Sequence, residues 1–173
     1  MQEELEYRIA SNDDADNITS LVNSVYRGDN AKKGWTTEAE LIDGIRITSE
    51  RVNEIINTDS NVILLAIINN IAGCVHLEKI GDKCHLGMLS VDVNIQNLGI
   101  GKKMMKQSEH YAKNIFKCSE IEMKVIGQRQ ELINYYLRRG YHITGEKEPF
   151  VLNTHFGKPK SDDLYFMYLV KKL

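Results

Sequence analysis

The chain has 173 residues, of which 42% are hydrophobic and 27% are charged, and its formal net charge is -2. This composition is typical of one soluble globular domain over residues 1–173, and it lacks the general positive charge that would favour binding of nucleic acid. The longest apolar run, residues 62–68, is far too short to span a membrane, and the three widely spaced cysteines favour a reducing, cytoplasmic location over a disulfide framework.

The N-terminal segment has the patterns of one strand and one helix. Residues 5–10 alternate between polar and apolar side chains, as a half-buried strand does. Within residues 11–26, apolar side chains recur at the spacing of one helix face. We expect Asn12 or Asp13 to cap this helix and Gly28 to end it.

A second helical segment is expected after a polar loop. Thr37 and Glu40 have the spacing of a capping box, which predicts that a helix starts there. Gly44 is expected to interrupt this helix, and Ser49 is expected to restart it.

Three closely spaced strands are predicted next. Residues 62–68 are continuously apolar, as expected for a strand that is buried on both faces. Asn69–Asn70 and Gly81–Asp82 form tight turns that separate this strand from residues 71–80 and residues 84–93. The segment therefore predicts an antiparallel meander.

The C-terminal half alternates between helices and strands. Residues 99–117 and residues 129–139 have helical periodicity, and Gly140 is expected to end the second of these helices. Residues 121–126 between them alternate like a strand. Residues 141–150 and 163–172 are expected to be two final strands. The chain therefore predicts an α/β fold in the order β-α-α-β-β-β-α-β-α-β-β. Its sheet would be mixed but mostly antiparallel, with about seven strands and with helices on both faces.

Two glycines stand at the start of the helix that is predicted from Gly99, in the sequence QNLGIGKKMMK of residues 96–106. A helix N-terminus presents unpaired N–H groups, and a glycine lets a phosphate approach them closely. Gly99 and Gly101 are too close together for a Walker A motif, and Met104 stands where a dinucleotide fingerprint needs a third glycine. An ordinary tight turn into a helix explains the glycines alone equally well.

The context of the glycines resembles the GNAT family of acyl-CoA N-acyltransferases. Residues 96–101 fit the family pattern Q/R-x-x-G-x-G/A, and residues 136–141 are similar to its Y-x-x-x-G-F/Y signature. The element order also matches, so the resemblance covers essentially the whole chain and implies a single-domain GNAT fold. Val93 departs from a common proline, and Arg129 and Leu132 stand where the family often has asparagine and alanine.

The resemblance implies acetyl-CoA as the co-substrate and no metal ion. Backbone groups of the strand at residues 84–93 would pair with the pantetheine arm like an added strand, and N–H groups of the glycine loop would hold the pyrophosphate. Arg129 would reach a phosphate in place of the usual asparagine contact. The cofactor-binding residues implied in this way are Leu89, Val91, Gln96, Leu98, Gly99, Ile100, Gly101, Lys102 and Arg129.

The same resemblance implies roles in catalysis. Tyr136 is expected to be the general acid that protonates the departing thiolate, because a tyrosine hydroxyl is protonated at neutral pH. Glu78 or His85 is a candidate for the base that removes a proton from the amine, although some members of the family need no dedicated base. Tyr26 and Trp35 are expected to line the acceptor pocket.

The sequence does not choose the acceptor among a small amine, a polyamine and a peptide amine. The expected activity is direct acetyl transfer in a ternary complex, and the slightly acidic balance favours a cationic acceptor such as a polyamine. The alternatives are a catalytically silent acyl-CoA sensor or regulatory module, and another nucleotide-binding α/β protein. The protein would be a monomer or a homodimer that pairs through an edge strand such as residues 163–172. No membrane partner is expected.

A metal site is a weaker interpretation of the cysteines and histidines. Cys74 and His76 share one face of a predicted strand, whereas Cys84 and His85 are adjacent and face opposite sides. Because the spacing of two paired zinc ligands is missing, we expect these residues to have structural roles.

Overall fold

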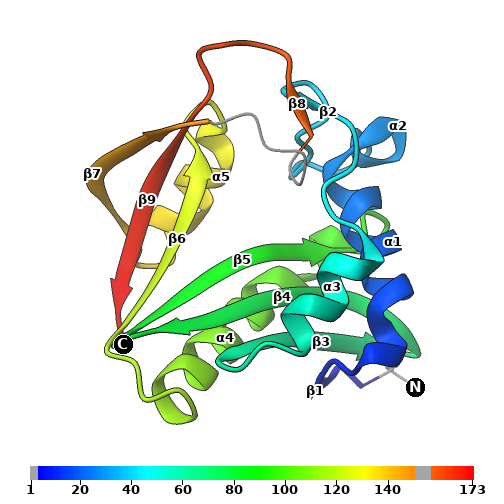
Figure 1. Cartoon of the computed structure of the whole chain (residues 1–173), viewed down its shortest axis with the longest axis vertical. Coiled ribbons are helices and arrows are strands. Elements are labelled where there is room, and N and C mark those ends of the chain that lie inside the picture. Colours follow the sequence, from blue (N-terminus) through cyan, green and yellow to red (C-terminus); the bar gives the residue numbers. More distant parts are fainter. Residues whose placement is uncertain (1–3, 151–156) are drawn as a thin grey trace.

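One mixed sheet organises the part of the chain that the computed structural model describes, residues 4–150 and 157–173. Its strands are β1 (Glu6–Ile9), β3 (Asn61–Ile68), β4 (Asn70–Ile80), β5 (Lys83–Val91), β6 (Glu120–Ile126), β7 (His142–Pro149) and β9 (Tyr165–Lys172). They lie in the spatial order β1-β3-β4-β5-β6-β9-β7 (Figure 1). Neighbouring strands are antiparallel except β5 and β6, which are parallel. The predicted α/β fold with a mixed sheet is confirmed.

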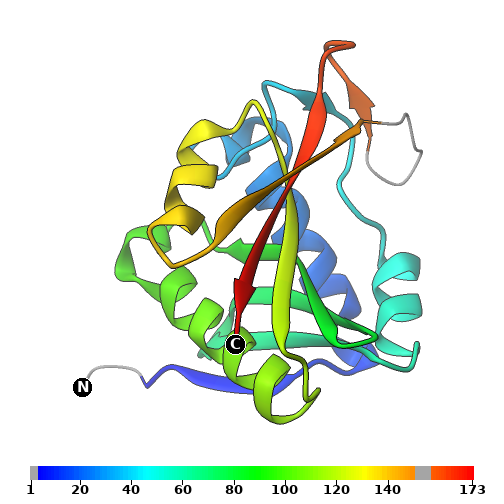
Figure 2. The same ribbon diagram turned by 90° about the vertical axis from the view of Figure 1, so that its left-hand side faces the viewer.

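Helices cover both faces of this sheet. They are α1 (Ala15–Tyr26), α2 (Gly28–Ala31), α3 (Ser49–Ile56), α4 (Ile100–Asn114) and α5 (Gln130–Leu137), with single 3-10 turns η1 (Asn12–Asp14) and η2 (Gln96–Leu98). α1 and α3 pack together on one face, whereas α4 packs against the strands from the other (Figure 1 and Figure 2). α5 lies beside β7.

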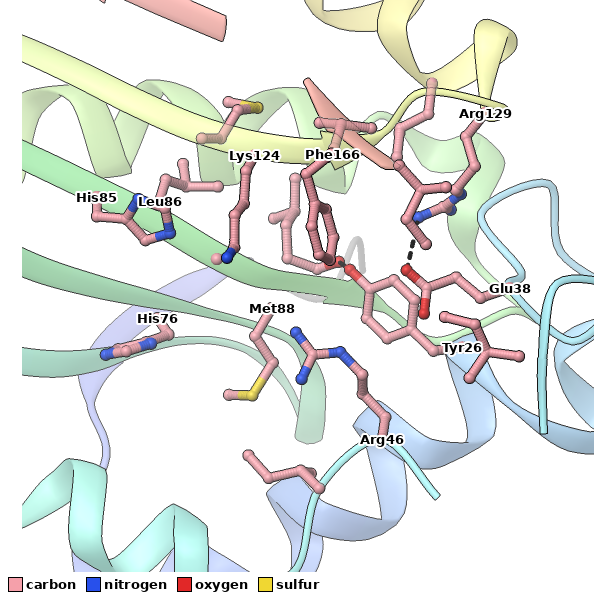
Figure 3. A pocket seen from close by; sticks show the side chains of 18 of the residues that line it. Tyr26, Glu38, Arg46, His76, His85, Leu86, Met88, Lys124, Arg129 and Phe166 are labelled. Atoms are coloured by element: carbon pink, nitrogen blue, oxygen red, sulfur yellow. Dashed lines mark hydrogen bonds and ion pairs between the residues drawn. The ribbon is translucent and has the colours of Figure 1, made fainter. Parts of the chain in front are cut away.

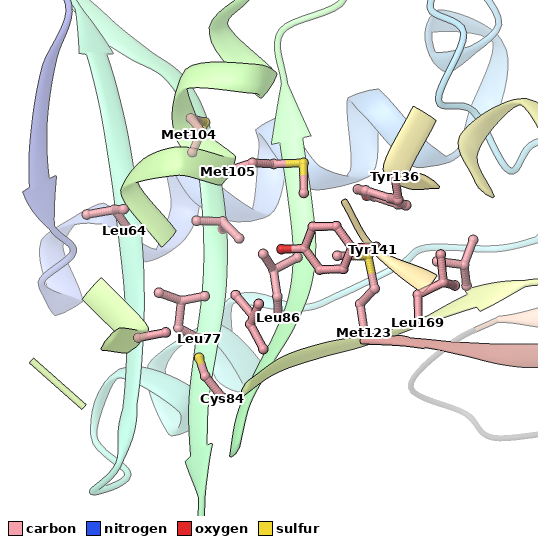
Figure 4. Close-up of a cluster of buried hydrophobic side chains, with 14 of the residues drawn as sticks. Leu64, Leu77, Cys84, Leu86, Met104, Met105, Met123, Tyr136, Tyr141 and Leu169 are labelled. Atoms are coloured by element: carbon pink, nitrogen blue, oxygen red, sulfur yellow. The ribbon is translucent and has the colours of Figure 1, made fainter. Parts of the chain in front are cut away.

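β3 supplies apolar side chains to both faces, as its continuous apolar sequence predicts. Ile63 and Leu65 pack with α1 and α3, whereas Leu64 and Ala66 pack with α4. Successive side chains of a strand point to opposite faces, and here each face is covered by helices. Figure 4 shows the cluster on the α4 side, where Leu64 lies near Met104.

The sheet divides between β5 and β6. Their parallel pairing joins only Lys83–His85 to Glu120–Glu122, at one end of each strand. Beyond these residues the two strands diverge, so that β6, β9 and β7 turn away from β5 (Figure 1). The resemblance implied that the pantetheine arm pairs with this strand like an added strand, and the divergence leaves one side of β5 without a neighbouring strand.

The segment after Thr37 is not a helix, so that prediction was wrong. Thr37 Oγ1 accepts a hydrogen bond from the backbone N–H of Ala39 at 3.0 Å, which forms a local turn. Further along, β2 (Ile42–Asp43) pairs with β8 (Lys158–Pro159) as a separate two-stranded sheet. Pairing with a segment that is distant in sequence therefore overrides the local helix signal.

The helix termini agree with the sequence in part. Neither Asn12 nor Asp13 is the cap: Ser11 caps the 3-10 turn η1 in a capping box with Asp14, and Asp14 is the residue that precedes α1. Gly140 follows α5 with a φ of 91°, a left-handed conformation that favours glycine, as predicted for the end of this helix.

α4 and α5 are both shorter than predicted. α4 ends at Asn114, and Ile115, which follows it, is 59% exposed. α5 ends at Leu137, which is 37% exposed. The chain therefore leaves the helical path early in both places, although Phe116 after α4 still packs against the apolar cluster on that side of the sheet.

Candidate active site

Two cavities open where β5 and β6 diverge. The ionic cavity, with a volume of about 290 Å³, is lined by Arg27, Arg46 and Arg129 among other residues. The glycine-loop cavity, of about 250 Å³, is lined by Gly99 and Gly101 among others. Four residues line both cavities, and we call them the shared wall: Tyr26, Leu89, Leu132 and Tyr136. Molecules in the two cavities would meet at this wall.

The glycine pair lies at the N-terminus of α4, in the glycine-loop cavity. Gly99 has a φ of 76°, a left-handed conformation that favours glycine. A Cβ at Gly99 would have no neighbour within 4 Å, and a Cβ at Gly101 would lie 3.3 Å from the hydroxyl of Tyr135. The first N–H groups of α4 have no acceptor within the helix. This open space beside free N–H groups fits an anion such as a phosphate.

Most of the predicted cofactor-binding residues line this cavity. They are Leu89, Val91, Gln96, Gly99, Gly101 and Lys102. Leu98 is 66% exposed outside the cavity, and Ile100 is buried in the core beside α4. Any ligand contact from Leu98 or Ile100 would therefore come from the backbone.

Gln96 connects the glycine loop to two other segments. Its side-chain amide donates hydrogen bonds to Thr36 Oγ1 at 3.0 Å and to the carbonyl of Val91 at 3.2 Å. Its Oε1 is buried without a hydrogen-bond partner among the described residues. A Cβ at Gly34 would lie 2.5 Å from that oxygen, so a glycine is needed for this close approach.

Trp35 lines the glycine-loop cavity, whereas we expected it beside Tyr26 in the acceptor pocket. The centroid of its ring lies 5.0 Å from that of Tyr135. The guanidinium of Arg139 lies 3.3 Å from the centroid of the Tyr135 ring. Tyr135 and Arg139 also line the cavity, although neither was among the expected cofactor-binding residues. The helix period turns Tyr135 away from Tyr136, but it turns it toward this cavity.

Tyr26 and Tyr136 are the polar members of the shared wall. They are buried, with only 8% and 5% of their surfaces exposed. The hydroxyl of Tyr26 donates a hydrogen bond to the carbonyl of Leu89. Burial raises the pKa of Tyr26 to about 12 and also raises the pKa of Tyr136. Both hydroxyls therefore remain protonated at neutral pH and can act as donors.

Two side chains already donate hydrogen bonds to backbone carbonyls of β5, where this strand diverges from β6. The carbonyl of Leu89 accepts the Tyr26 hydroxyl, and the carbonyl of Val91 accepts the Gln96 amide. Met88 has a φ of 57°, close to a register shift between β4 and β5. An extended ligand that pairs with β5 would therefore use the N–H groups or displace these donors.

Glu78 and His85, the candidate bases, both line the ionic cavity. They are directly opposite each other in the register of β4 and β5. Burial is the main cause that lowers the pKa of His85, so its imidazole is neutral at pH 7 and can accept a proton. Four residue steps along β5 separate His85 from Leu89, which is about 13 Å in an extended strand. A proton from the shared wall would therefore reach His85 through water.

Arg129 lines the ionic cavity and not the glycine-loop cavity, although we expected it to reach a phosphate. Its Nη1 lies 3.1 Å from Glu38 Oε1 (Figure 3), while Nη2 of Arg27 lies 3.2 Å from Glu38 Oε2. These three side chains are at most 10% exposed. Arg129 also donates to the carbonyl of Thr36. Glu38 was not among the expected site residues, because a helix was expected to start in this segment.

The other candidate chemistries have less support. Among residues 4–150 and 157–173, no group of three or more His, Cys, Asp or Glu side chains is arranged to hold a metal ion. Burial raises the pKa of Cys74 and of Cys84 to about 12, so these thiols are poor nucleophiles at neutral pH. No helix in the described part of the chain is long and apolar enough to cross a membrane.

Comparison with known families gives one clear match. The profile described as "Acetyltransferase (GNAT) family" matches residues 26–141, more than half of the chain. The matched segment includes the glycine loop, the shared wall and the ion cluster of Arg27, Glu38 and Arg129. No curated protein sequence matches the chain significantly.

Solved structures with the same fold extend this match to almost the whole chain. An N-acetyltransferase from Staphylococcus aureus is 15% identical, with a TM-score of 0.73 over 98% of this chain and 97% of that chain. A spermidine N-acetyltransferase chimera from Vibrio cholerae and hSSAT is 13% identical, with a TM-score of 0.67 over 97% and 95%. A GNAT family acetyltransferase from Elizabethkingia anophelis with acetyl-CoA bound is 20% identical, with a TM-score of 0.57 over 72% and 82%.

Proposed function

The chain belongs to the acetyltransferase (GNAT) family, and on that premise we propose that it transfers the acetyl group of acetyl-CoA to a primary amine. Both substrates would be bound together, and the acetyl group would pass directly between them. The observation that carries this proposal is the shared wall, where a cavity with phosphate-binding geometry meets a cavity with ionisable side chains.

Acetyl-CoA would occupy the glycine-loop cavity. Its pyrophosphate would lie in the open space beside Gly99 and Gly101, where the N-terminus of α4 supplies N–H groups and partial positive charge. Lys102 and Arg139 line the same cavity and add positive charge. The acetylated end would reach the shared wall, next to Leu89. A member of this fold class with acetyl-CoA bound supports this choice of ligand.

Tyr136 would act as the general acid. The nitrogen of the neutral amine attacks the thioester carbonyl, a C–N bond forms, and the C–S bond breaks. The departing thiolate takes the proton of the Tyr136 hydroxyl, which solvent then restores. The buried position of Tyr136 in the shared wall and its raised pKa keep this proton available at neutral pH.

The proton that the amine loses would pass through water to His85 or Glu78. Both side chains line the ionic cavity, and His85 is neutral at pH 7 because burial lowers its pKa. The distance along β5 makes a water relay necessary. A base that acts at a distance contributes less than Tyr136, so substitution of His85 should lower turnover less than substitution of Tyr136.

Ligand-induced thermal stabilisation tests the first half of the proposal. Acetyl-CoA at saturating concentration should raise the melting temperature, whereas ATP and NAD should not. No shift with acetyl-CoA would reject the proposal. A panel of amines with detection of released thiol tests the second half. Stabilisation without thiol release from any amine would instead favour the alternative of a catalytically silent acyl-CoA sensor.

A further inference from the structure

The ionic cavity concentrates positive charge in a chain whose net charge is negative. Its described lining contains five arginine or lysine side chains but only two carboxylates, Glu38 and Glu78. Glu38 is held between Arg27 and Arg129 and is not available to bind a cation. The remaining cationic side chains of the lining are Arg46, Lys124 and Arg51, of which Arg51 pairs with Glu54 at 2.9 Å.

We infer that the amine acceptor carries an anionic group, as a small amino acid does, and that Arg46 and Lys124 bind this group. The inference rests on the proposed function, because it names the class of amine that the ionic cavity would receive. It reverses the expectation from net charge, which favoured a polyamine. The global charge balance is set by the whole surface, whereas the acceptor meets only the charges that line its cavity.

Arg46 is held firmly at the cavity. The side-chain oxygen of Asn23 accepts hydrogen bonds from the backbone N–H groups of Arg46 at 2.7 Å and Ile47 at 3.1 Å. The guanidinium of Arg46 lies 5.9 Å from the centroid of the Tyr26 ring, so it is close to the shared wall. In Figure 3 it points toward the space between Met88 and Lys124. The hydrogen bonds from Asn23 fix the backbone from which this side chain extends, and a guanidinium in this position is suited to a carboxylate.

Lys124 approaches the same space from β6, on the opposite side of the cavity (Figure 3). Its Nζ lies 4.6 Å from the centroid of the Phe166 ring and 3.7 Å from Glu148 Oε1. Glu148 is 42% exposed and also accepts a hydrogen bond from the hydroxyl of Tyr168. Glu148 therefore keeps a partner when Lys124 turns toward a bound anion, and the long, partly exposed ion pair is weak.

This positive charge contributes to lowering the pKa values of two histidines at the same end of the cavity. The pKa of His76 is lowered to about 4, chiefly by burial, with further contributions from His85, Arg51 and Arg46. The pKa of His85 is lowered mainly by burial and also by Lys124, while Glu122 and Glu78 oppose this. Both imidazoles are therefore neutral at pH 7, and the positive charge in this region comes from arginine and lysine.

The size of the cavity favours a small acceptor. A volume of about 290 Å³ is near the lower end of ligand pockets, and it suits one amino acid better than a long polyamine. The amine would lie at the shared wall near Tyr136, and the anionic group would lie between Arg46 and Lys124. A polyamine would instead place its further positive charges next to these side chains, which is unfavourable.

The test compares amines that differ only in the anionic group. Thiol release is measured with methionine against methioninamide, glycine against glycinamide and 4-aminobutyrate against 4-aminobutyramide, with spermidine as a cationic probe. We expect kcat/KM to be at least about tenfold higher for each acid than for its amide, as one lost charged contact implies. An amino acid amide has a lower amine pKa than the corresponding acid, so it offers more of the neutral, nucleophilic amine at pH 7.5. This difference favours the amide, so a preference for the acid would have to overcome it.

Two variants test whether a preference for acids over amides depends on the ionic cavity. Lys124→Met and Arg46→Met should each raise KM for the acids at least about fivefold while the values for the amides stay within about twofold. Lys113→Met removes an exposed cation on α4, outside both cavities, and should leave the preference intact. If one variant fails to fold, the other carries this comparison, and the substrate pairs need no variant.

The outcomes separate the two proposals. Equal rates for acids and amides, faster turnover of spermidine, or an unchanged preference in both variants overturn the inference. In each of these cases thiol release still supports acetyl transfer to amines. Failure of acetyl-CoA to stabilise the protein, together with no thiol release from any amine, instead overturns the proposed function and the inference with it.

Discussion

The Arg129 guanidinium lies 3.1 Å from the carboxylate of Glu38, although 91 residues separate them in sequence. Arg129 immediately precedes α5, the helix that carries Tyr136. Glu38 follows the segment in which Thr36 accepts a hydrogen bond from Gln96 of the glycine loop. This buried ion pair therefore connects the segment around Thr36, which lines the glycine-loop cavity, to the helix that supplies the proposed general acid.

The Glu38→Ala variant should be strongly destabilised. Removal of this carboxylate leaves Arg27 and Arg129 buried without their shared partner, and breaking a buried ion pair in this way costs about 3 kcal/mol. Urea denaturation should show a lower midpoint. The matched control is Glu54→Ala, which removes an exposed carboxylate paired with Arg51 and should change the midpoint little. Equal midpoints for the two variants would mean that the buried cluster does not stabilise the fold.

The Tyr136→Phe variant should lower kcat about a hundredfold while acetyl-CoA stabilises the protein as before. The substitution removes the hydroxyl that would protonate the thiolate but keeps the ring in the shared wall. Because burial raises the pKa of Tyr136, turnover by the unmodified protein should not fall between pH 7 and pH 9 through loss of this proton. Tyr111→Phe is the control, since Tyr111 packs on Phe116 and lines neither cavity. Unchanged kcat in Tyr136→Phe would remove this residue from the mechanism.

Gly99→Ala should weaken acetyl-CoA binding at least about tenfold, because its Cβ would enter the space assigned to the pyrophosphate. Gly81→Ala is a matched control. Both glycines have a left-handed φ, 76° and 60°, and neither Cβ would meet an atom of the protein within 4 Å. Each alanine should therefore cost about 1–2 kcal/mol of stability through backbone strain. Titration calorimetry should find weaker binding only in Gly99→Ala, and the same affinity in both variants would place the pyrophosphate elsewhere.

His76 should make the protein less stable in mild acid. Burial and nearby positive charge lower its folded-state pKa to about 4, below the ordinary value of about 6.5. The unfolded chain therefore binds a proton that the folded chain does not bind between these values. The resulting stabilisation is complete above about pH 6.5 and is lost as the pH falls toward 4, by up to about 3 kcal/mol.

Urea denaturation at pH 7.5 and pH 4.5 measures this effect. His76→Gln keeps a polar group beside Asn61, whose Oδ1 lies 2.6 Å from His76 Nε2, and it removes the titrating imidazole. The loss of stability between the two pH values should become smaller in His76→Gln. It should be unchanged in His110→Gln, an exposed position on α4. The same pH dependence in both variants would show that other groups cause the effect.

Much of the fold follows from local sequence patterns. The apolar run that became β3 indicated a strand buried on both faces, and Gly140 indicated the end of α5, because each signal is contained within a few residues. The helix signal at Thr37 and Glu40 was also local, but it was wrong. Glu38 is fixed by two distant arginines, and β2 pairs with β8, so tertiary contacts decided that segment.

In the candidate site, too, local sequence patterns identified some residues, whereas others depend on tertiary contacts. The glycine loop and Tyr136 could be identified because family patterns fix their spacing along the chain. Tyr135 and Arg139 were missed in the glycine-loop cavity, although they stand next to Tyr136 and Gly140 of the recognised family signature. Their contribution depends on which way α5 faces the opening between β5 and β6, and spacing along the chain does not determine that direction.

By itself, the sequence determined the α/β fold, and it indicated a candidate phosphate-binding loop at Gly99 and a candidate acid at Tyr136. Each of these depends on residues that are close together in the chain, where periodicity and backbone geometry act. Only the tertiary structure decided where the charges of the ionic cavity lie. Arg46 and Lys124 come from a loop and a strand that are far apart in sequence, and the divergence of β5 and β6 leaves them on opposite sides of one space. Because the acceptor would meet that local charge and not the net charge of the chain, the preference for an anionic amine could not be inferred before the fold was known.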